Sequence, residues 1–230
     1  MRPPCRTARF SRTVSGMRRR SVIRRPFAYQ QYNAVLWIVA ANVIVFALTS
    51  FAMELTTLLA MNPIETMRMG MVWQPFTYMF VHSPTNYAHI LFNMFGLFIF
   101  GTQVERRLGS TEFLVFYLVA GLLAGVLSLL VYLVSGALHI QLLGASGAVF
   151  ATLLAYATLY PDSTIFLFAI VPIKAPALVI GFTALELFRG ISNPQSGVAH
   201  LTHLAGFVVA YIYFRVRLGI SPLRVFTGRE

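Results

Sequence analysis

A serine and two histidines stand at the starts of two apolar stretches that are far apart in the chain. Ser146 belongs to Gly144-Ala145-Ser146-Gly147-Ala148-Val149-Phe150, a run of small residues that opens a hydrophobic segment. His200 and His203 belong to Ala199-His200-Leu201-Thr202-His203-Leu204-Ala205-Gly206, which opens another. A hydroxyl beside an imidazole is the pair from which enzymes build an activated nucleophile and its general base. The sequence therefore suggests a nucleophilic site assembled from two separate helices.

The composition places those helices in a lipid bilayer. The chain of 230 residues is 57% hydrophobic and 11% charged, and its mean hydropathy is +0.72. Soluble domains carry about 25% charged residues, so an integral membrane protein with one domain is expected. Cys5 is the single cysteine, which leaves neither a disulfide framework nor a cysteine-based metal site.

The formal net charge of +11 is concentrated at the N-terminus, where nine of the eighteen Lys and Arg lie within the first 25 residues. No aromatic residues alternate with these arginines as a single-strand binding groove would require, so nucleic acid is not an expected partner. We expect residues 1–26 to form a basic cytoplasmic tail that fixes the topology. An organelle transit peptide is the alternative, and Met17 is an alternative start to Met1.

Hydropathy and length predict an all-α bundle of six membrane spans in residues 27–216, followed by a basic tail over 217–230. The expected spans are 34–53, 89–104, 112–134, 146–160, 177–188 and 198–214, with a loop or hairpin over 166–176 before the fifth. With the N-terminus inside, sixteen Lys and Arg lie on the cytoplasmic side and two, Arg68 and Arg189, lie outside. This asymmetry predicts that both termini are cytoplasmic.

The topology brings four polar side chains to a similar depth. Spans two, four and six all run inward from the outer side, so His89, Asn93, Ser146 and His203 are expected within roughly 10 Å of the outer surface. Polar groups in a membrane are costly and usually face a protein interior or a water-filled cavity. One wet site that opens outward is therefore predicted.

Each of these signals also has a purely structural interpretation. Small residues around Ser146 are typical of close helix packing. His89 and Asn93 lie one helical turn apart and face the same way, as a clasp between helices would also require. Three histidines, His89, His200 and His203, are potential metal ligands, but no acid is near them in sequence and the His-Glu-x-x-His pattern is absent. No metal or other cofactor is therefore expected.

The ordered motifs of the chain resemble the rhomboid family of intramembrane serine proteases. The family's Gly-x-Ser-Gly reads Gly144-Ala145-Ser146-Gly147, its His-x-x-x-Asn reads His89-Ile90-Leu91-Phe92-Asn93, and its last-span histidine motif ends in His203-Leu204-Ala205-Gly206. Glu105-Arg106-Arg107-Leu108-Gly109 follows span two, and Trp73-Gln74-Pro75-Phe76-Thr77 is similar to the family's Trp-Arg-x-x-Thr loop. Gln74 in place of that arginine is expected to loosen the first loop.

The resemblance implies a role for each candidate residue. Ser146 is the expected nucleophile and His203 its general base. No carboxylate is expected to orient the imidazole, so the pair would act as a dyad, with Phe150 packing on the His203 ring. His89, Asn93 and the Ser146 N–H would hold the oxyanion. Four supporting residues complete the expected site: Gly144, Gly147, Gly206 and His200, the last contacting substrate or water.

The implied function is cleavage of transmembrane segments of other membrane proteins near the outer face. The expected location is the bacterial inner membrane, with an organelle inner membrane as the alternative, and no oligomeric state is implied. A non-proteolytic relative that binds transmembrane helices is the main competing hypothesis. A small transporter is disfavoured because it needs a polar pathway across the membrane, and the inner halves of the spans carry no row of polar residues that would continue the outer cluster.

Overall fold

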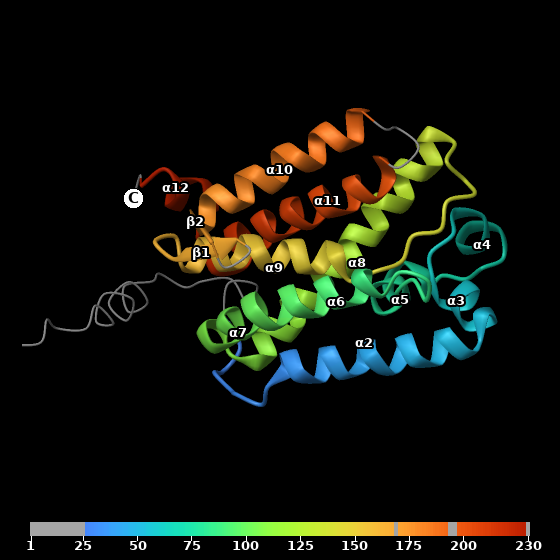
Figure 1. The fold of residues 1–230 in the computed structure, drawn as a ribbon, viewed down its shortest axis with the longest axis horizontal. Coiled ribbons are helices and arrows are strands. Elements are labelled where there is room, and N and C mark those ends of the chain that lie inside the picture. Colours follow the sequence, from blue (N-terminus) through green and yellow to red (C-terminus); the bar gives the residue numbers. More distant parts are fainter. Residues whose placement is uncertain (1–25, 168–169, 193–196, 229–230) are drawn as a thin grey trace, which may run out of the picture.

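The computed structural model of the protein describes residues 26–167, 170–192 and 197–228. Its described part is a bundle of helices with one two-stranded antiparallel hairpin (Figure 1). The elements are α2 (Ala34–Phe51), α3 (Met53–Leu59), α4 (Pro63–Arg68), α5 (Gln74–Thr77), the 3₁₀ turn η2 (Tyr78–Phe80), α6 (Tyr87–Gly96), the π-helical turn η3 (Leu97–Gly101), α7 (Thr102–Leu108), α8 (Ser110–Ser135), α9 (Ser146–Leu159), β1 (Thr164–Leu167), β2 (Val171–Lys174), α10 (Ala175–Ser192), α11 (Gly197–Tyr213), the π-helical turn η4 (Phe214–Leu218) and α12 (Pro222–Phe226).

Five helices of the described chain are long and apolar enough to cross a membrane. They are Ala34–Phe51, Tyr87–Leu108, Ser110–Ser135, Ala175–Ser192 and His200–Leu218. The expected fourth span is present as α9, an apolar helix of only 14 residues. The fifth is longer than expected, because Ala175 begins it directly after the hairpin and Ser192 ends it. The protein is thus a multi-pass, all-α membrane protein apart from the hairpin.

The hairpin falls where the sequence interrupts the apolar pattern before the fifth span. Its strands pair with Ile165 opposite Ile173 and Phe166 opposite Pro172. The Lys174 ammonium group donates to the Asp162 carbonyl oxygen at 2.6 Å, which ties the hairpin to the end of α9. The hairpin therefore connects α9 to α10 without crossing the bundle.

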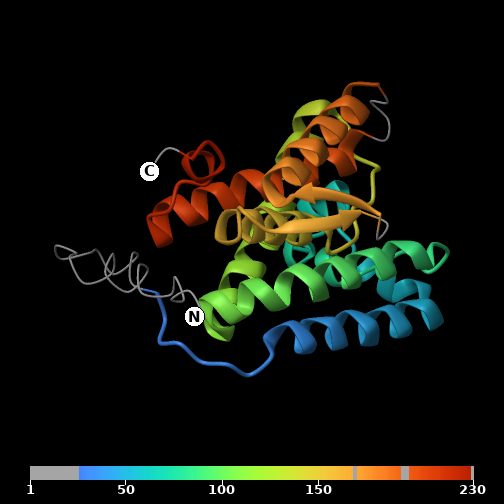
Figure 2. The same ribbon diagram turned by 60° about the vertical axis from the view of Figure 1, so that its left-hand side comes forward.

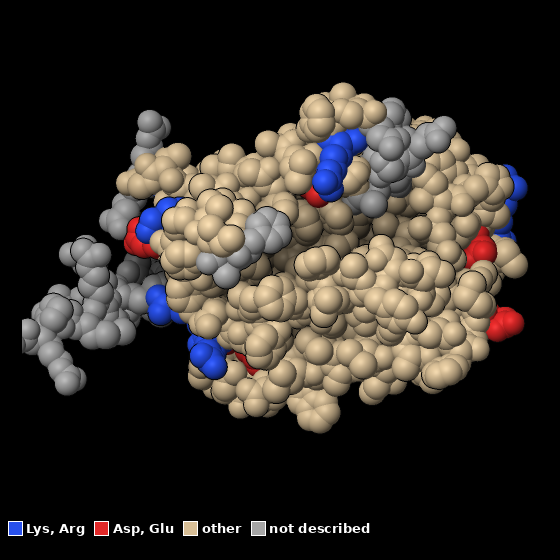
Figure 3. Space-filling model, viewed as in Figure 1, with Lys and Arg blue, Asp and Glu red and all other residues tan. Residues whose placement is uncertain are grey.

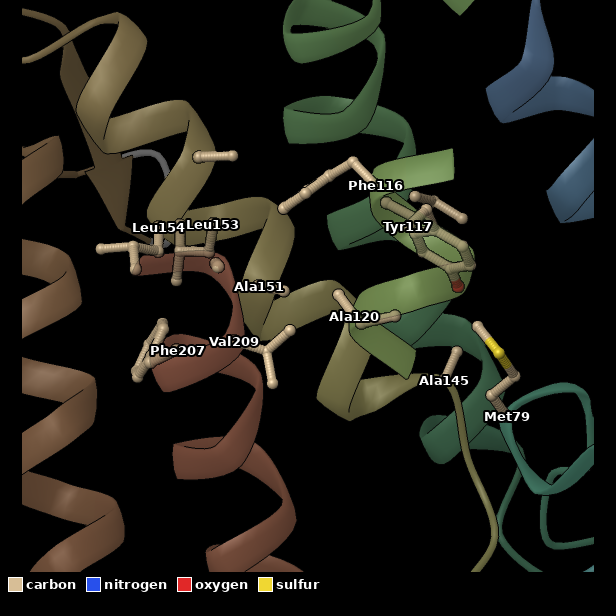
Figure 4. Packing of buried hydrophobic residues seen from close by; sticks show 14 of the residues in the cluster. Met79, Phe116, Tyr117, Ala120, Ala145, Ala151, Leu153, Leu154, Phe207 and Val209 are labelled. Atoms are coloured by element: carbon tan, nitrogen blue, oxygen red, sulfur yellow. The ribbon is translucent and has the colours of Figure 1, made fainter. Parts of the chain in front are cut away.

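α9 and α11 lie in the middle of the bundle, between α10 on one side and α2 on the other (Figures 1 and 2). Small side chains allow this arrangement. In the close-up of Figure 4, Ala120 of α8 and Ala151 of α9 lie between larger side chains such as Phe116 and Phe207. Both alanines are fully buried, so larger residues there would force the helices apart.

Two glycines bring α9 and α11 into backbone contact. A Cβ atom on Gly206 would overlap the carbonyl oxygen of Gly147, and one on Gly147 would lie 3.1 Å from the Ala124 Cβ and 3.2 Å from the Thr202 Cγ2. The Thr202 hydroxyl is also 2.7 Å from the Ser128 hydroxyl of α8. These contacts fix the first turns of α9 and the middle of α11 relative to each other.

A buried carboxylate defines the start of α2. Asn33 has a φ of 58° and makes no side-chain cap. The Glu105 carboxylate instead accepts the Ala34 N–H at 2.6 Å and the Val35 N–H at 3.1 Å, and the Ser110 hydroxyl donates to it as well. Because the first N–H groups of a helix need acceptors, Glu105 fastens the start of α2 to the end of α7.

Gln74 holds the first loop together, which corrects the expectation that it loosens this loop. The side chain is fully buried. Its amide group donates to the Thr57 carbonyl oxygen at 3.1 Å and to Glu65 Oε2 at 3.0 Å. Its oxygen accepts the Asn62 N–H at 3.1 Å and the Thr66 hydroxyl at 2.8 Å. A neutral amide offers both donors and acceptors, so it joins α3 and α4 without an arginine.

Both ends of the described chain lie at the end of the bundle that carries α7 and α12 (Figures 1 and 2). Residues 1–25 of the expected basic tail lie outside the described residues. The stretch expected to be the second tail, 217–230, includes the end of η4 and all of α12. Arg217 there pairs with the buried Glu112 of α8 at 3.0 Å, and Glu112 also accepts the Tyr213 hydroxyl.

Candidate active site

The hydroxyl of Ser146 and the imidazole of His203 meet at the contact between α9 and α11. His203 Nε2 lies 2.8 Å from Ser146 Oγ, a hydrogen-bond distance. Ser146 is the first residue of α9, where its position at a helix start surrounds it with backbone N–H groups. The Gly147–Gly206 contact next to this pair removes the side chains that would otherwise keep the two helices apart.

A carboxylate lies on the other side of the His203 ring. Glu186 Oε2 is 3.0 Å from His203 Nδ1 and 2.5 Å from His200 Nδ1. Glu186 belongs to α10 and is buried. The expectation that no carboxylate orients the imidazole is therefore wrong. His200, expected to contact substrate or water, has Glu186 as its partner.

The remaining face of the imidazole is covered by an aromatic ring. Phe150 and His203 are stacked, with ring centroids 4.3 Å apart and planes inclined by 10°. Phe207 and Phe182 contact Phe150 in turn, with centroids at 5.2 and 5.7 Å. The ring of His203 is thus held by a stack, by Glu186 and by the serine hydroxyl.

His89 and Asn93 lie on α6, across from Ser146. The Asn93 amide donates one N–H to the His89 carbonyl oxygen at 2.8 Å, which leaves its second N–H available. The His89 ring packs over Gly144, since a Cβ there would come 2.6 Å from His89 Nε2. Gly144 also has a φ of 119°, a conformation that side chains disfavour. Glycine is thus required at this position for two reasons.

A fourth histidine, His82, supports the loop that precedes Ser146. The His82 ring contacts His89 edge-on, with centroids 5.1 Å apart. It is fully buried, and its Nε2 accepts the Ala145 N–H at 3.4 Å. Burial, with a smaller contribution from His89, lowers the pKa of His82 to about 4. A neutral imidazole therefore supports the residue that precedes Ser146.

The serine, the histidine that it contacts and the two polar residues of α6 line one cavity of about 660 Å³. Figure 3 shows the surface hollowed between α10 and α6, the two helices that flank it. Polar residues at the cavity include Asn86, His89, Asn93, Ser146, His203 and Arg189. Most of the remaining lining is apolar, with aromatic side chains from α6, α9 and α10. The structure thus brings the four residues that the sequence placed at one depth to a single cavity.

Two residues of this site were missed from the sequence. Glu186 is an acid inside an apolar span, and such acids usually have a partner, which is a signal that could have found it. His82 is followed by Ser83 and Pro84 at the end of a loop, and nothing in that pattern predicts its contact with Ala145.

Comparison with known families bears on this arrangement. Residues 69–219 match the Rhomboid domain, which is more than half of the chain and includes α6 through α11. The chain belongs to the rhomboid family. This confirms the family that the motifs around Ser146, His89 and His203 indicate.

Two rhomboid relatives illustrate the range of the family. The chain is 30% identical over 203 residues to the mitochondrial RHOMBOID-like protein 12 of Arabidopsis thaliana, covering 81% of this chain and 59% of that protein. It is 28% identical over 190 residues to the rhomboid protease GlpG of Haemophilus influenzae, covering 81% of this chain and 92% of the relative. The protein therefore has bacterial and organelle rhomboid relatives, and it spans less than two thirds of the plant one.

Proposed function

We propose that this rhomboid is an intramembrane serine endopeptidase that cleaves transmembrane segments of other membrane proteins near the outer face of the membrane. The observation that supports it best is the hydrogen-bonded series Ser146 Oγ, His203 Nε2, His203 Nδ1 and Glu186 Oε2, with distances of 2.8 and 3.0 Å. This series has the connectivity of a nucleophile, its base and the group that orients the base.

The serine and histidine carry out the proton transfers. His203 Nε2 takes the hydroxyl proton as Ser146 Oγ attacks the scissile carbonyl carbon, which gives a tetrahedral intermediate. The imidazolium then returns this proton to the leaving amine, and the acyl-enzyme forms. Water enters next and attacks the acyl carbon while it loses a proton to the same nitrogen. The imidazolium then returns this proton to Ser146 Oγ as the ester bond breaks and the new carboxyl end leaves.

Glu186 is a positioning residue in this scheme. Nε2 is a base only when the proton of the neutral ring is on Nδ1, and a carboxylate 3.0 Å from Nδ1 favours that tautomer. The same negative charge stabilises the imidazolium that forms during attack. We therefore replace the expected dyad with a Ser146–His203 pair that Glu186 orients and Phe150 supports by stacking.

The oxyanion of the intermediate has three donors in our proposal. The Ser146 N–H and the free N–H of Asn93 supply two, and the His89 ring supplies the third. Ser146 also stands at the positive end of the α9 dipole, which favours negative charge at that point. Since the anion exists only after attack, these donors would stabilise the transition state more than bound substrate.

The cavity suits an apolar substrate. Phe92, Phe95, Phe100 and Phe182 line it beside the polar groups, so a transmembrane segment could leave lipid for a surface that is also apolar. A helical segment hides its peptide bonds in its own hydrogen bonds. The segment must therefore unwind at the serine before a carbonyl group can reach it.

We further propose the six-span topology with residues 27–216 as the membrane domain, α9 as its short fourth span, and both termini in the cytoplasm. Helix α7, whose last turn carries Arg106 and Arg107, lies at the same end of the bundle as both described chain termini (Figures 1 and 2), which supports this orientation. We place the protein in a bacterial inner membrane. An organelle inner membrane is the alternative, as in the plant relative's name.

Purified protein in detergent, offered a test transmembrane substrate, tests the proposal. We expect cleavage by the wild-type protein, none by Ser146→Ala or His203→Ala, and no further loss in the double variant, because the two residues act as a unit. A serine-directed covalent reagent should label Ser146 and block cleavage. A folded wild-type protein that binds the substrate without cleaving it would instead favour a helix-binding function.

A further inference from the structure

We propose that Glu186, His200 and His203 form a binding site for a zinc ion, and that zinc bound there inhibits the enzyme. The inhibitory part rests on the proposed function, whereas the binding part does not. One potential ligand atom from each side chain lies within 4.8 Å of the other two. Two imidazole nitrogens and a carboxylate oxygen are a common ligand set for zinc in proteins.

The three side chains are arranged around one point. His200 and His203 are three residues apart on α11 and direct their Nδ1 atoms to the same oxygen of Glu186 on α10, at 2.5 and 3.0 Å. A tetrahedral zinc ion with bonds of about 2.0 Å holds its ligand atoms about 3.3 Å apart. The two Nδ1–oxygen distances would therefore lengthen by about 0.8 and 0.3 Å, and the three ligand atoms, all within 4.8 Å of one another, would settle at this spacing.

We infer that zinc enters through the exposed parts of the two histidines. The side chains of His200 and His203 are 15% and 18% exposed, although that of Glu186 is only 5% exposed. His203 lines the cavity directly. A fourth position on the ion would then be left for water, as in zinc sites with three protein ligands.

Zinc on Nδ1 of His203 would prevent the ring from acting as a base. A neutral imidazole has one N–H, and the base role requires it on Nδ1 so that Nε2 keeps its lone pair. When the metal takes the Nδ1 lone pair, the proton of the neutral ring must be on Nε2. That N–H faces Ser146 Oγ and cannot accept the serine proton, so attack on the substrate stops.

Direct binding is measured on the full chain carrying Ser146→Ala, which removes activity and keeps all three ligands. Cys5→Ser removes the single thiol, and the affinity tag contains no histidine. Competition with a chromophoric chelator is expected to show one zinc ion per chain. His200→Gln or Glu186→Gln should weaken binding at least about tenfold. His139→Gln, which removes an exposed histidine between α8 and α9, is the matched control and should bind as before.

Activity is then measured at buffered free zinc in the Cys5→Ser background with Ser146 intact. Saturable inhibition that a chelator reverses is expected, and Mg²⁺ at the same concentration should have no effect, since it prefers oxygen ligands. His200→Gln, compared with its own zinc-free rate, should need at least about tenfold more zinc for half inhibition.

The two measurements separate the two proposals. Equal zinc affinity in His200→Gln, Glu186→Gln and the control would overturn the zinc site. Zinc that binds the three residues but raises turnover would overturn its inhibitory role and indicate a metal-dependent reaction. A zinc-free wild-type protein that never cleaves would contradict the proposed function, whereas the binding measurement still decides the site.

Discussion

Phe150 lies parallel to the imidazole of His203, with 4.3 Å between the ring centroids and 10° between their planes. Phe150 is one helical turn after Ser146 on α9, so the helix that carries the proposed nucleophile also holds the proposed base. The same stack fixes the ring plane in which Nε2 faces Ser146 and Nδ1 faces Glu186.

We predict that Phe150→Leu lowers kcat about 2- to 13-fold. The range follows from the 0.5–1.5 kcal/mol of a typical aromatic pair, roughly converted into rate. Phe150→Tyr keeps the ring and should retain most of the wild-type kcat. Steady-state kinetics and melting temperatures, measured on the same preparations, compare kcat and stability between each variant and the wild type. A Leu variant with wild-type kcat and a lower melting temperature would mean that the stack only fills space.

Glu186→Gln should lower kcat about 10- to 100-fold and leave KM nearly unchanged. The amide cannot stabilise the imidazolium, and its N–H disfavours the tautomer that attack requires. Loss of the orienting acid in a soluble serine protease costs about 10⁴-fold, and the Phe150 stack should make the loss smaller here. Glu186→Asp should recover part of the rate.

Glu112→Gln is a matched control for this variant. Glu112 is also a buried acid, and it accepts hydrogen bonds from Tyr213 and Arg217 away from the cavity. We expect it to lower the melting temperature and to leave kcat unchanged. If both Gln variants lose stability and keep their kcat, Glu186 is structural only.

Asn93→Ala should reduce kcat on the order of tenfold with little change in KM, because its free N–H acts only on the oxyanion. His89→Ala should cost more, since it also exposes the wall next to Gly144. The Asn93 amide already bonds to the His89 carbonyl oxygen one turn earlier, and the clasp between helices that the sequence also allows is the competing role. Wild-type turnover in a destabilised Asn93→Ala protein would favour the clasp.

The lowered pKa of His82 predicts how the stability of the fold changes with pH. Its pKa falls to about 4 in the fold, below the ordinary value of 6.5. Between these values the unfolded chain binds more protons than the folded one, so stability is full above pH 6.5 and falls as the pH drops toward 4. The full effect is on the order of 3 kcal/mol.

His82→Gln tests this linkage, because an amide oxygen can still accept the Ala145 N–H. The variant should start less stable at pH 7, and its difference from wild type should shrink as the pH falls to 4. Melting temperatures over this range measure the difference. Parallel curves for the two proteins would show that His82 does not carry the pH dependence.

The motif residues of the site could be predicted because their spacing and topology both point to one place. Ser146, His203, His89 and Asn93 occupy helices that run in the same direction, and helix geometry places them at one depth. The position of Phe150 beside the site could also be predicted, because a single helical turn separates it from Ser146. These residues could be placed without knowing how α10 packs.

Glu186 could not be placed in this way, because its contacts with His200 and His203 depend on how α10 turns against α11. Its sequence distance from His203 carries no information on that rotation. The prediction for Gln74 is also wrong, since its four hydrogen-bond partners, from α3, from α4 and from the residue before α4, meet only after the loop folds. The predicted fourth span, 146–160, ends one residue beyond the observed α9.

α9 has 14 residues and is therefore about 21 Å long, whereas the hydrocarbon layer of a bilayer is about 30 Å thick. With its inner end at the cytoplasmic boundary, its first residue, Ser146, would lie well below the opposite lipid headgroups. Such a mismatch favours a locally thinner bilayer around the protein. If the protein cleaves as proposed, lipid chain length should act on it much as a ligand does. The protein reconstituted in liposomes of progressively longer phospholipids should then cleave the same substrate at progressively lower rates.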